Sequence, residues 1–313
     1  MKRKKIIIPI AVLLVLLVVL LLTFWYGSKD YGFKLYNNHA EITAYKGTDK
    51  NVVIPDRIFG KKVTIIKSAF KGNDRIEAVK LPKYLEEVGA NAFKECKNLE
   101  TVYFGENIKV VRAVAFENCI KLKNIDLNEG LEEIEDYAFN GTEQLEAIEI
   151  PSSVKRIGSL TFENSGLKEV IFQGENALIE ERTFENTPWK EKQEGFLICG
   201  DNVLVSYNGA EEVVQVPSGV KYISADFDKA KEIKELYLPD TVVEIIDVSC
   251  LWKRGVRIYI PSSVIRIRDD MYSLFDLSNV TIVTTAGSYA EEFAKENGFS
   301  LEIVDEIVYP QEK

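Results

Sequence analysis

The chain has 313 residues, of which 46% are hydrophobic and 28% are charged, a composition that excludes a disordered or collagen-like protein. Its formal net charge is −10. Without the four basic residues at positions 2–5 the remainder carries −14, which disfavours nucleic acid as a partner. One histidine and four cysteines are too few for a histidine-based metal site or a disulfide scaffold.

Residues 1–27 have the pattern of a cytoplasmic basic tail followed by a transmembrane signal-anchor. Lys2, Arg3, Lys4 and Lys5 precede an uncharged run of 21 residues from Ile6 to Tyr26. A helix of that length covers roughly 30 Å, the thickness of a bilayer core. Because basic residues stay in the cytoplasm, the rest of the chain is expected outside the cell. The alternative is a signal peptide that is cleaved, which would leave a secreted protein.

Residues 28–62 are predicted to form an N-terminal hairpin cap and a first partial rung, a rung being one turn of a solenoid. Phe33 to Tyr45 alternates in polarity around Asn37-Asn38, which is typical of a hairpin, and Val52 to Pro55 follows as a short strand. His39 lies beside the hairpin turn. No cysteine or acidic cluster shares its segment, so we interpret it as an exposed turn residue and not as a catalytic or metal-binding one.

Residues 63–190 repeat a unit of 22–23 residues. Phenylalanines mark the repeat, and each is followed by a short run in which apolar and polar residues alternate, as in a strand with one buried face. A unit this short cannot bury a core alone, but stacked copies can. The spacing therefore predicts a ladder of buried rings, which resumes once after a 43-residue interval: Phe70, Phe93, Phe116, Phe139, Phe162, Phe184 and Phe227.

The remaining segments complete the predicted domain organisation. Residues 191–212 form a hairpin insertion, residues 213–285 resume the repeats, and residues 286–313 supply a capping helix and a tail. In the resumed repeats Cys250 and Tyr272 take the phenylalanine position. Ser288 to Asn297 has the pattern of a capped helix that ends at Gly298 and places Tyr289 and Phe293 on one face, over the last open strand.

This pattern resembles the BspA-type leucine-rich repeats of bacterial surface proteins. Pro151-Ser152-Ser153-Val154-Lys155-Arg156-Ile157 followed by Phe162 matches the repeat closely, and the resemblance covers about residues 31–305. It implies a β-rich repeat solenoid with a parallel sheet, a location at the cell surface and, in some members, a role in adhesion. Cys250, Tyr272 and the 43-residue interval depart from the family pattern.

Two further groups of residues permit either a purely structural or a functional interpretation. Cys96 and Cys119 occupy equivalent positions in successive repeats, so stacking would bring their α-carbons roughly 5 Å apart, which permits a disulfide. We favour two buried thiols, because parallel stacking points both side chains the same way. The acidic pairs at 86–87, 132–133 and 180–181 suggest either a calcium-binding column or a solvated face, and we favour the solvated face because no dedicated calcium loop is present.

The outward strand positions are the candidate ligand-binding surface. Alternation places them in columns, and tyrosine is enriched at binding sites. The candidates are Tyr103, Asp126, Glu149, Ile171, Tyr237, Tyr259 and Arg257. Since no nucleophile–base pair or metal cluster can be assembled, we predict no catalysis, no metal and no cofactor. The expected function is recognition of another protein or a surface polymer, with a passive surface spacer as the alternative.

Overall fold

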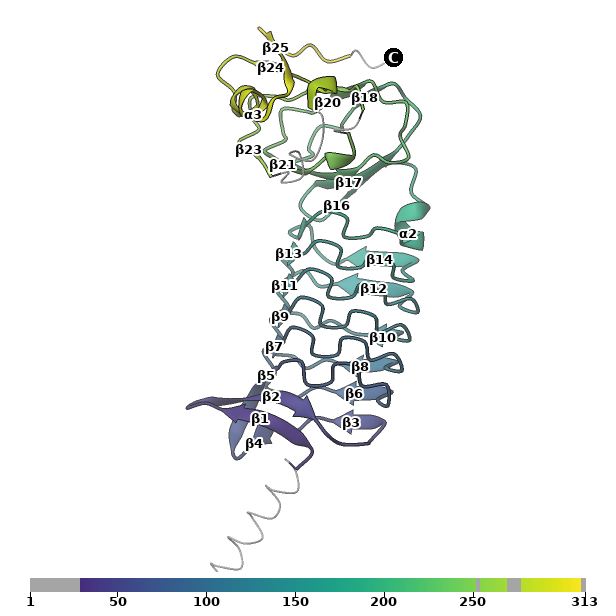
Figure 1. Cartoon of the computed structure of the whole chain (residues 1–313), viewed down its shortest axis with the longest axis vertical. Helices are drawn as coiled ribbons and strands as arrows, with labels where there is room; N and C mark the ends of the chain where they lie inside the picture. The colour runs from purple at the N-terminus through teal and green to yellow at the C-terminus, as the bar shows by residue number, and fades with distance from the viewer. Residues whose placement is uncertain (1–28, 252–253, 269–276, 311–313) are drawn as a thin grey trace, which may run out of the picture.

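The computed structural model describes residues 29–251, 254–268 and 277–310, which form an elongated solenoid (Figure 1). Within these ranges no helix is both long and apolar enough to cross a membrane. The anchor predicted at residues 1–27 and Tyr272 both lie outside the described residues.

The first half of the solenoid carries two rows of strands on opposite sides, where the sequence had predicted one sheet. Sheet I lies on the left in Figure 1 and contains β1 (Tyr31–Leu35), β2 (His39–Tyr45), β4 (Arg57–Ile58), β5 (Lys61–Ile66), β7 (Glu87–Val88), β9 (Val110–Val111), β11 (Glu133–Ile134), β13 (Arg156–Ile157) and β15 (Leu178–Ile179). On the right, sheet II contains β3 (Asn51–Val53), β6 (Ala78–Lys80), β8 (Thr101–Tyr103) and β10 (Asn124–Ile125). Sheet III continues that side with β12 (Ala147–Ile150) and β14 (Glu169–Phe172).

The second half repeats this arrangement after the expected hairpin. Sheet IV contains β16 (Gly195–Cys199), β17 (Val203–Asn208), β19 (Tyr222–Asp226), β21 (Glu244–Asp247) and β23 (Arg266–Ile267). Sheet V contains β18 (Val213–Gln215), β20 (Glu235–Tyr237), β22 (Arg257–Tyr259), β24 (Thr281–Thr285) and β25 (Ser300–Val304). Helical segments are short: α2 (Pro188–Glu191), η1 (Ser249–Leu251), η3 (Leu277–Asn279) and α3 (Tyr289–Asn297). Apart from the hairpins β1–β2, β4–β5 and β16–β17, the pairings between the described strands are parallel.

The phenylalanines form the predicted ladder through the first half. All seven side chains are buried, and from Phe70 to Phe184 each ring stacks on the next with centroids 4.9–5.5 Å apart. Tyr45 stacks below Phe70, and Trp189 packs edge-on against Phe184 at the other end. Phe227 is buried in a second core, where its nearest ring is that of Tyr207 at 6.2 Å.

From Phe70 to Phe184 each phenylalanine is held by a tight turn with a left-handed residue on either side of it. The residues two before the phenylalanine have φ between 52° and 58°, and these are Ser68, Asn91, Val114, Tyr137, Leu160 and Arg182. The residues two after it have φ between 55° and 69°, and these are Gly72, Glu95, Asn118, Gly141, Asn164 and Asn186. Glycine and asparagine tolerate this conformation, which explains their recurrence at the second position.

Buried charges join the two halves. Lys190 is only 6% exposed at its side chain, and its Nζ lies 2.9 Å from Glu185 Oε2 and 2.7 Å from Asp226 Oδ2. Burial alone would lower the pKa of Lys190, but the attraction of Asp226 and Glu185 outweighs burial and raises it. Because Glu185 belongs to the first half and Asp226 to the second, the ammonium group links them across the inserted hairpin.

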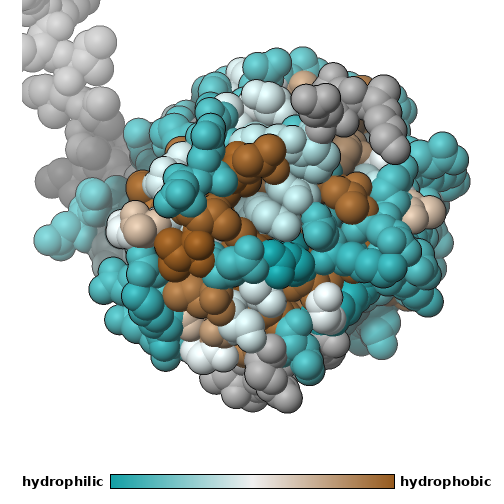
Figure 2. All heavy atoms as spheres, turned by 90° about the horizontal axis from the view of Figure 1, so that it is seen from above, coloured by the Kyte–Doolittle hydropathy of each residue, from teal (hydrophilic) through white to brown (hydrophobic). Residues whose placement is uncertain are grey.

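The C-terminal end contains the expected helix and one strand that the sequence analysis missed. Ser288 Oγ accepts from Glu291 N at 3.1 Å, and Gly298 ends α3 with φ of 81°, as predicted. Phe293 is buried, but Tyr289 is 39% exposed, so the shared covering face was wrong. The last strand is β25, which follows the helix and extends sheet V. Figure 2 looks onto this end and shows apolar patches between polar ones.

Candidate binding surface

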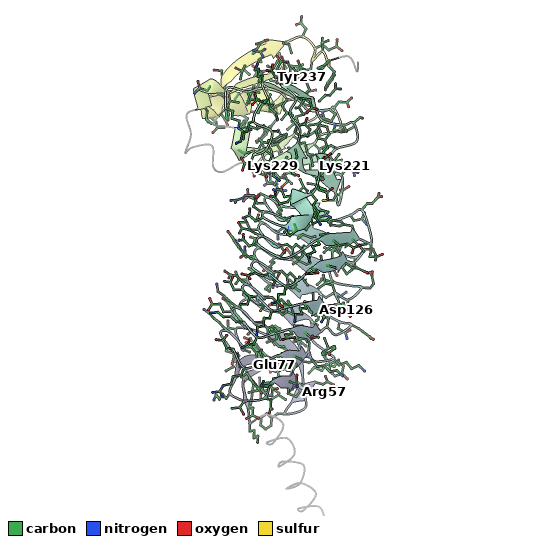
Figure 3. The ribbon with its side chains drawn as sticks, turned by 90° about the vertical axis from the view of Figure 1, so that its right-hand side faces the viewer. Arg57, Glu77, Asp126, Lys221, Lys229 and Tyr237 are labelled. Carbon is green, nitrogen blue, oxygen red and sulfur yellow. The ribbon has the colours of Figure 1, made fainter. Side chains whose placement is uncertain are left out.

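The predicted columns exist locally, but they do not make one continuous surface. Lys80 pairs in register with Tyr103, Glu149 with Ile171, and Tyr237 with Tyr259. Between these pairs the row of strands is divided into sheets II, III and V. Figure 3 shows Asp126 in the lower half of the solenoid and Tyr237 near its far end. The candidate residues therefore fall into three separate groups.

The first group surrounds Tyr103 on sheet II. Tyr103 is 58% exposed, and Val53, two strands away in the same column, is 70% exposed. Together with Ala78 and Lys80 they line a shallow hollow of about 430 Å³. The prediction did not include Val53 among the outward candidates, because its rung was considered partial. The alternating burial of Asn51–Val53 is nevertheless the same as that of the later strands.

The second group lies where the row of strands is interrupted. β10 ends sheet II and β12 begins sheet III, with no ladder pairing between them. Beneath this break the rings of Phe116 and Phe139 still stack at 5.2 Å, so the separation is confined to the surface. Asn128 Nδ2 donates to Ile108 O at 3.1 Å and Glu106 O at 3.4 Å, contacts that tie the loop after β10 to the preceding rung.

The break is flanked by two hollows that are lined by carboxylates, together with Lys123 in the first. Their volumes are about 510 and 450 Å³, and both include Asp126 and Ala147. Glu149, Glu169 and the 40%-exposed Ile171 line the second hollow. Within the described part of the chain, Asp126, Glu149 and Glu169 have no ion-pair partner, and Glu149 accepts only a neutral hydrogen bond from Gln173. Three uncompensated carboxylates thus lie beside exposed aliphatic surface.

The third group corrects the sequence prediction for Tyr237. Its ring stacks on Tyr259 with centroids 3.8 Å apart, but Tyr237 is only 7% exposed. Tyr309, from the segment after β25, lies 6.2 Å from Tyr237 on another side and donates its hydroxyl to Leu238 O. Burial, followed by the hydrogen bonds of its hydroxyl group, raises the pKa of Tyr237. Tyr237 is therefore part of the packed interior and cannot act as an exposed anchor.

Arg257 and Tyr259 keep partial exposure at the edge of this cluster. The Arg257 guanidinium lies 2.7 Å from Glu302 Oε2, and its Nε lies 3.4 Å from the Tyr259 hydroxyl. These hydrogen bonds raise the pKa of Arg257. The binding capacity of the cationic group is thus largely used within the chain.

The acidic pairs lie on the opposite side, along sheet I, where one member of each pair contacts an arginine. Arg112 lies 2.9 Å from Glu87 and 2.6 Å from Glu135, each in a different rung. Arg156 likewise contacts Glu133, Asp136 and Glu180 at 3.0–3.2 Å, and Glu180 also pairs with Arg268. Glu180 is buried, so the expectation of a solvated face is wrong there. These carboxylates act as partners in cross-rung ion pairs.

The cysteines and the histidine occupy local packing positions. Cys96 and Cys119 are buried free thiols, which donate to the carbonyls of Phe70 and Phe93 at 2.9 and 3.1 Å. Burial, together with the neighbouring Cys96, raises the pKa of the Cys119 thiol well above its usual value. His39 begins β2, stacks on Tyr36 at 4.5 Å and bonds to Asn38.

One cluster of potential metal ligands occurs among the described residues, and its members already have partners. Asp226, Asp228 and Cys250 lie close enough to share an ion. Asp226 is paired with Lys190, Asp228 lies 3.7 Å from Arg254, and Cys250 Sγ accepts from Phe227 N. The arrangement is an acidic packing site. Nothing observed there points to a bound metal.

Parallel strand rows, a 22–23-residue unit and an inward phenylalanine in each unit define a leucine-rich repeat solenoid. Six copies of the BspA type leucine rich repeat region match residues 63–189 and 206–305, so the chain belongs to this family. No curated protein matches it.

This chain is similar to several solved bacterial structures. A leucine-rich cell surface protein from Faecalibacterium prausnitzii is 20% identical, with 85% of this chain and 95% of that chain covered and a TM-score of 0.51. A leucine-rich repeat protein from Bacteroides ovatus is 20% identical, with coverages of 81% and 69% and a TM-score of 0.47. The pneumococcal vaccine antigen PcpA is 16% identical, with coverages of 88% and 97% and a TM-score of 0.39. The similarity to the Faecalibacterium prausnitzii protein, with its TM-score of 0.51, shows a shared fold.

Proposed function

We propose that this protein is a non-catalytic recognition module at the bacterial cell surface, held in the membrane by residues 1–27. Two observations support this location: the basic cluster before a 21-residue apolar run, and the similarity to a protein described as a leucine-rich cell surface protein. The partner is another protein, bound through the side of the solenoid formed by sheets II and III.

The charge arrangement of this side carries the proposal. On sheet I Glu87, Glu133 and Glu180 are paired with arginines from neighbouring rungs, whereas Asp126, Glu149 and Glu169 on the other side are free of ion pairs among the described residues. Exposed Tyr103 and Ile171 flank them. A face that combines uncompensated carboxylates with aromatic and aliphatic contacts is complementary to a partner with basic residues set among apolar ones.

Capture from surface extracts tests this proposal. The full-length chain in lipid nanodiscs is incubated with extracts of bacterial and host-cell surfaces, and retained proteins are quantified by mass spectrometry. We expect Asp126→Lys/Glu149→Lys to lose specific partners by at least tenfold, because charge reversal replaces attraction by repulsion. Tyr103→Ala should weaken the same partners, since an anchor tyrosine commonly costs about 2 kcal/mol, or thirtyfold, when truncated.

The matched control is Glu232→Lys/Glu296→Lys, which reverses two exposed carboxylates outside this face. It should retain the partners of the wild-type chain. Identical capture by the wild type, the site variants and the control would refute recognition through sheets II and III. It would favour the alternative of a passive spacer.

A further inference from the structure

The charge of this chain is divided unevenly along the solenoid. Residues 29–83, which build the N-terminal end, contain 12 Lys and Arg against six Asp and Glu, a formal charge of +6. Residues 84–313 contain 23 basic against 43 acidic residues, a formal charge of −20. Residues 29–83 thus form a basic end, and residues 84–313 form a strongly acidic body. The two regions produce electrostatic potentials of opposite sign.

The lysines and arginines of the basic end also differ from those of the acidic body, because fewer of them form ion pairs. Of the 21 described Lys and Arg residues from Lys94 onward, 17 are in ion pairs, mostly between adjacent rungs. Within residues 29–83, where every position is described, ten of the 12 have no ion pair; Lys50 pairs with Glu77, and Lys29 also interacts. The positive charge of this end is therefore available to an outside partner.

Geometry gathers several of these cations around two neighbouring turns. The tip of hairpin β1–β2 and the turn between β4 and β5 are joined by Lys61 Nζ, which donates to Asn37 O at 2.6 Å. Beside this contact is a hollow of about 640 Å³ lined by Arg57, Lys61 and Lys62, together with His39 and one carboxylate, Glu86. Arg57 and Lys62 lie over the Tyr84 ring at 5.0 and 4.7 Å. Figure 3 shows Arg57 at the base of the solenoid.

Exposed apolar side chains accompany the cations. Leu35 and Tyr36 at the hairpin tip are 48% and 42% exposed, and Phe59 on the second turn is 46% exposed. The described chain begins at Lys29, shortly after the apolar run of residues 6–26 and at the opposite end of β1 from the hairpin tip. Basic residues mixed with exposed aromatic and aliphatic ones are the composition that favours the headgroup region of an anionic bilayer.

We propose that this basic end, defined by Arg57, Lys61, Lys62, Leu35, Tyr36 and Phe59, docks onto anionic lipid headgroups of the membrane that holds residues 1–27. The inference rests on the proposed anchor. The hollow beside Lys61 receives a lipid phosphate, and the exposed apolar side chains enter the interface. The acidic body is repelled by the same surface, so the solenoid stands away from the bilayer and leaves sheets II and III accessible to a partner.

Amide hydrogen exchange on the full-length chain tests the docking. The chain is placed in nanodiscs of phosphatidylcholine alone or with about a third of phosphatidylglycerol. Peptides covering residues 34–40 and 57–62 should exchange several-fold more slowly in the anionic discs. That protection should disappear at 0.5 M salt, where the Debye length falls to roughly 4 Å. Lys61→Glu/Lys62→Glu should abolish it as well, because each basic residue at such a surface adds about fivefold to binding.

Two controls make the result decisive. Lys97→Glu/Lys231→Glu reverses two exposed, unpaired lysines elsewhere and should keep the protection. Exchange in the peptide around Phe116 should be equal in all variants, which shows that they are folded. Equal exchange of residues 57–62 in neutral and anionic discs, or protection that survives Lys61→Glu/Lys62→Glu, overturns the docking. A chain that fails to enter either disc refutes the anchor instead.

Discussion

Removing the ring of Phe116 tests the stack on which the first half of the solenoid depends. Phe116 is fully buried, and the rings of Phe93 and Phe139 lie parallel to it on either side with centroids 5.2 Å away. Truncation of a buried phenylalanine costs about 3–5 kcal/mol, and the loss of two aromatic pairs at about 0.5–1.5 kcal/mol each places Phe116→Ala at the upper end of that range. Urea unfolding of the detergent-solubilised chain, followed by circular dichroism, measures the change in unfolding free energy.

A double-mutant cycle isolates the stacking contribution. Phe116→Leu and Phe139→Leu keep apolar volume but remove the ring contact, so their effects should be non-additive by about 0.5–1.5 kcal/mol. The matched cycle pairs Phe116→Leu with Phe227→Leu, whose ring lies in the second core, and should be additive within about 0.5 kcal/mol. A cost below about 1 kcal/mol for Phe116→Ala would show that the buried face is wrongly assigned. Equal coupling in both cycles would show that stacking adds nothing.

Three other substitutions have expected outcomes in the same unfolding assay. Val114 is β-branched yet has φ of 55°, so Val114→Asn should stabilise the chain by about 1 kcal/mol, whereas Val110→Asn in strand β9 should destabilise it. Lys190→Met leaves Glu185 and Asp226 without their shared cation and should cost about 3–5 kcal/mol. Because the pKa of Lys190 is raised in the folded state, the difference from wild type should be constant from neutral pH up to pH ~10.5 and shrink as the pH rises through the folded-state pKa. Tyr237→Ala should destabilise the chain by about 2–4 kcal/mol, because Tyr237 is buried. Tyr103→Ala should change stability by less than about 0.5 kcal/mol, because Tyr103 is exposed. Equal effects of the two substitutions would contradict this difference in burial.

The sequence predicted what depends on the repeat itself and missed what depends on contacts between distant repeats. The spacing of the phenylalanines identified the buried stack, because identical units must place identical residues one above another. The burial of Tyr237 could not be foreseen, since Tyr309 reaches it from 72 positions along the chain. The break between β10 and β12 also escaped prediction, because both strands keep the alternating pattern and only their pairing differs. Whether the outward residues bind a ligand stays a prediction.

The two sides of the first half differ in how far their surface residues are committed to folding. On sheet I a single arginine such as Arg156 contacts carboxylates from the rungs on either side of its own, so a change there removes links between repeats. Outward residues of sheets II and III such as Tyr103 and Asp126 make no such links among the described residues. Because stability in a solenoid is nearly a sum of neighbour contacts, substitutions of outward residues without such links leave the sum almost unchanged. The fold therefore permits the sheet II and III surface to adapt to a partner while sheet I and the phenylalanine stack keep the rungs in register.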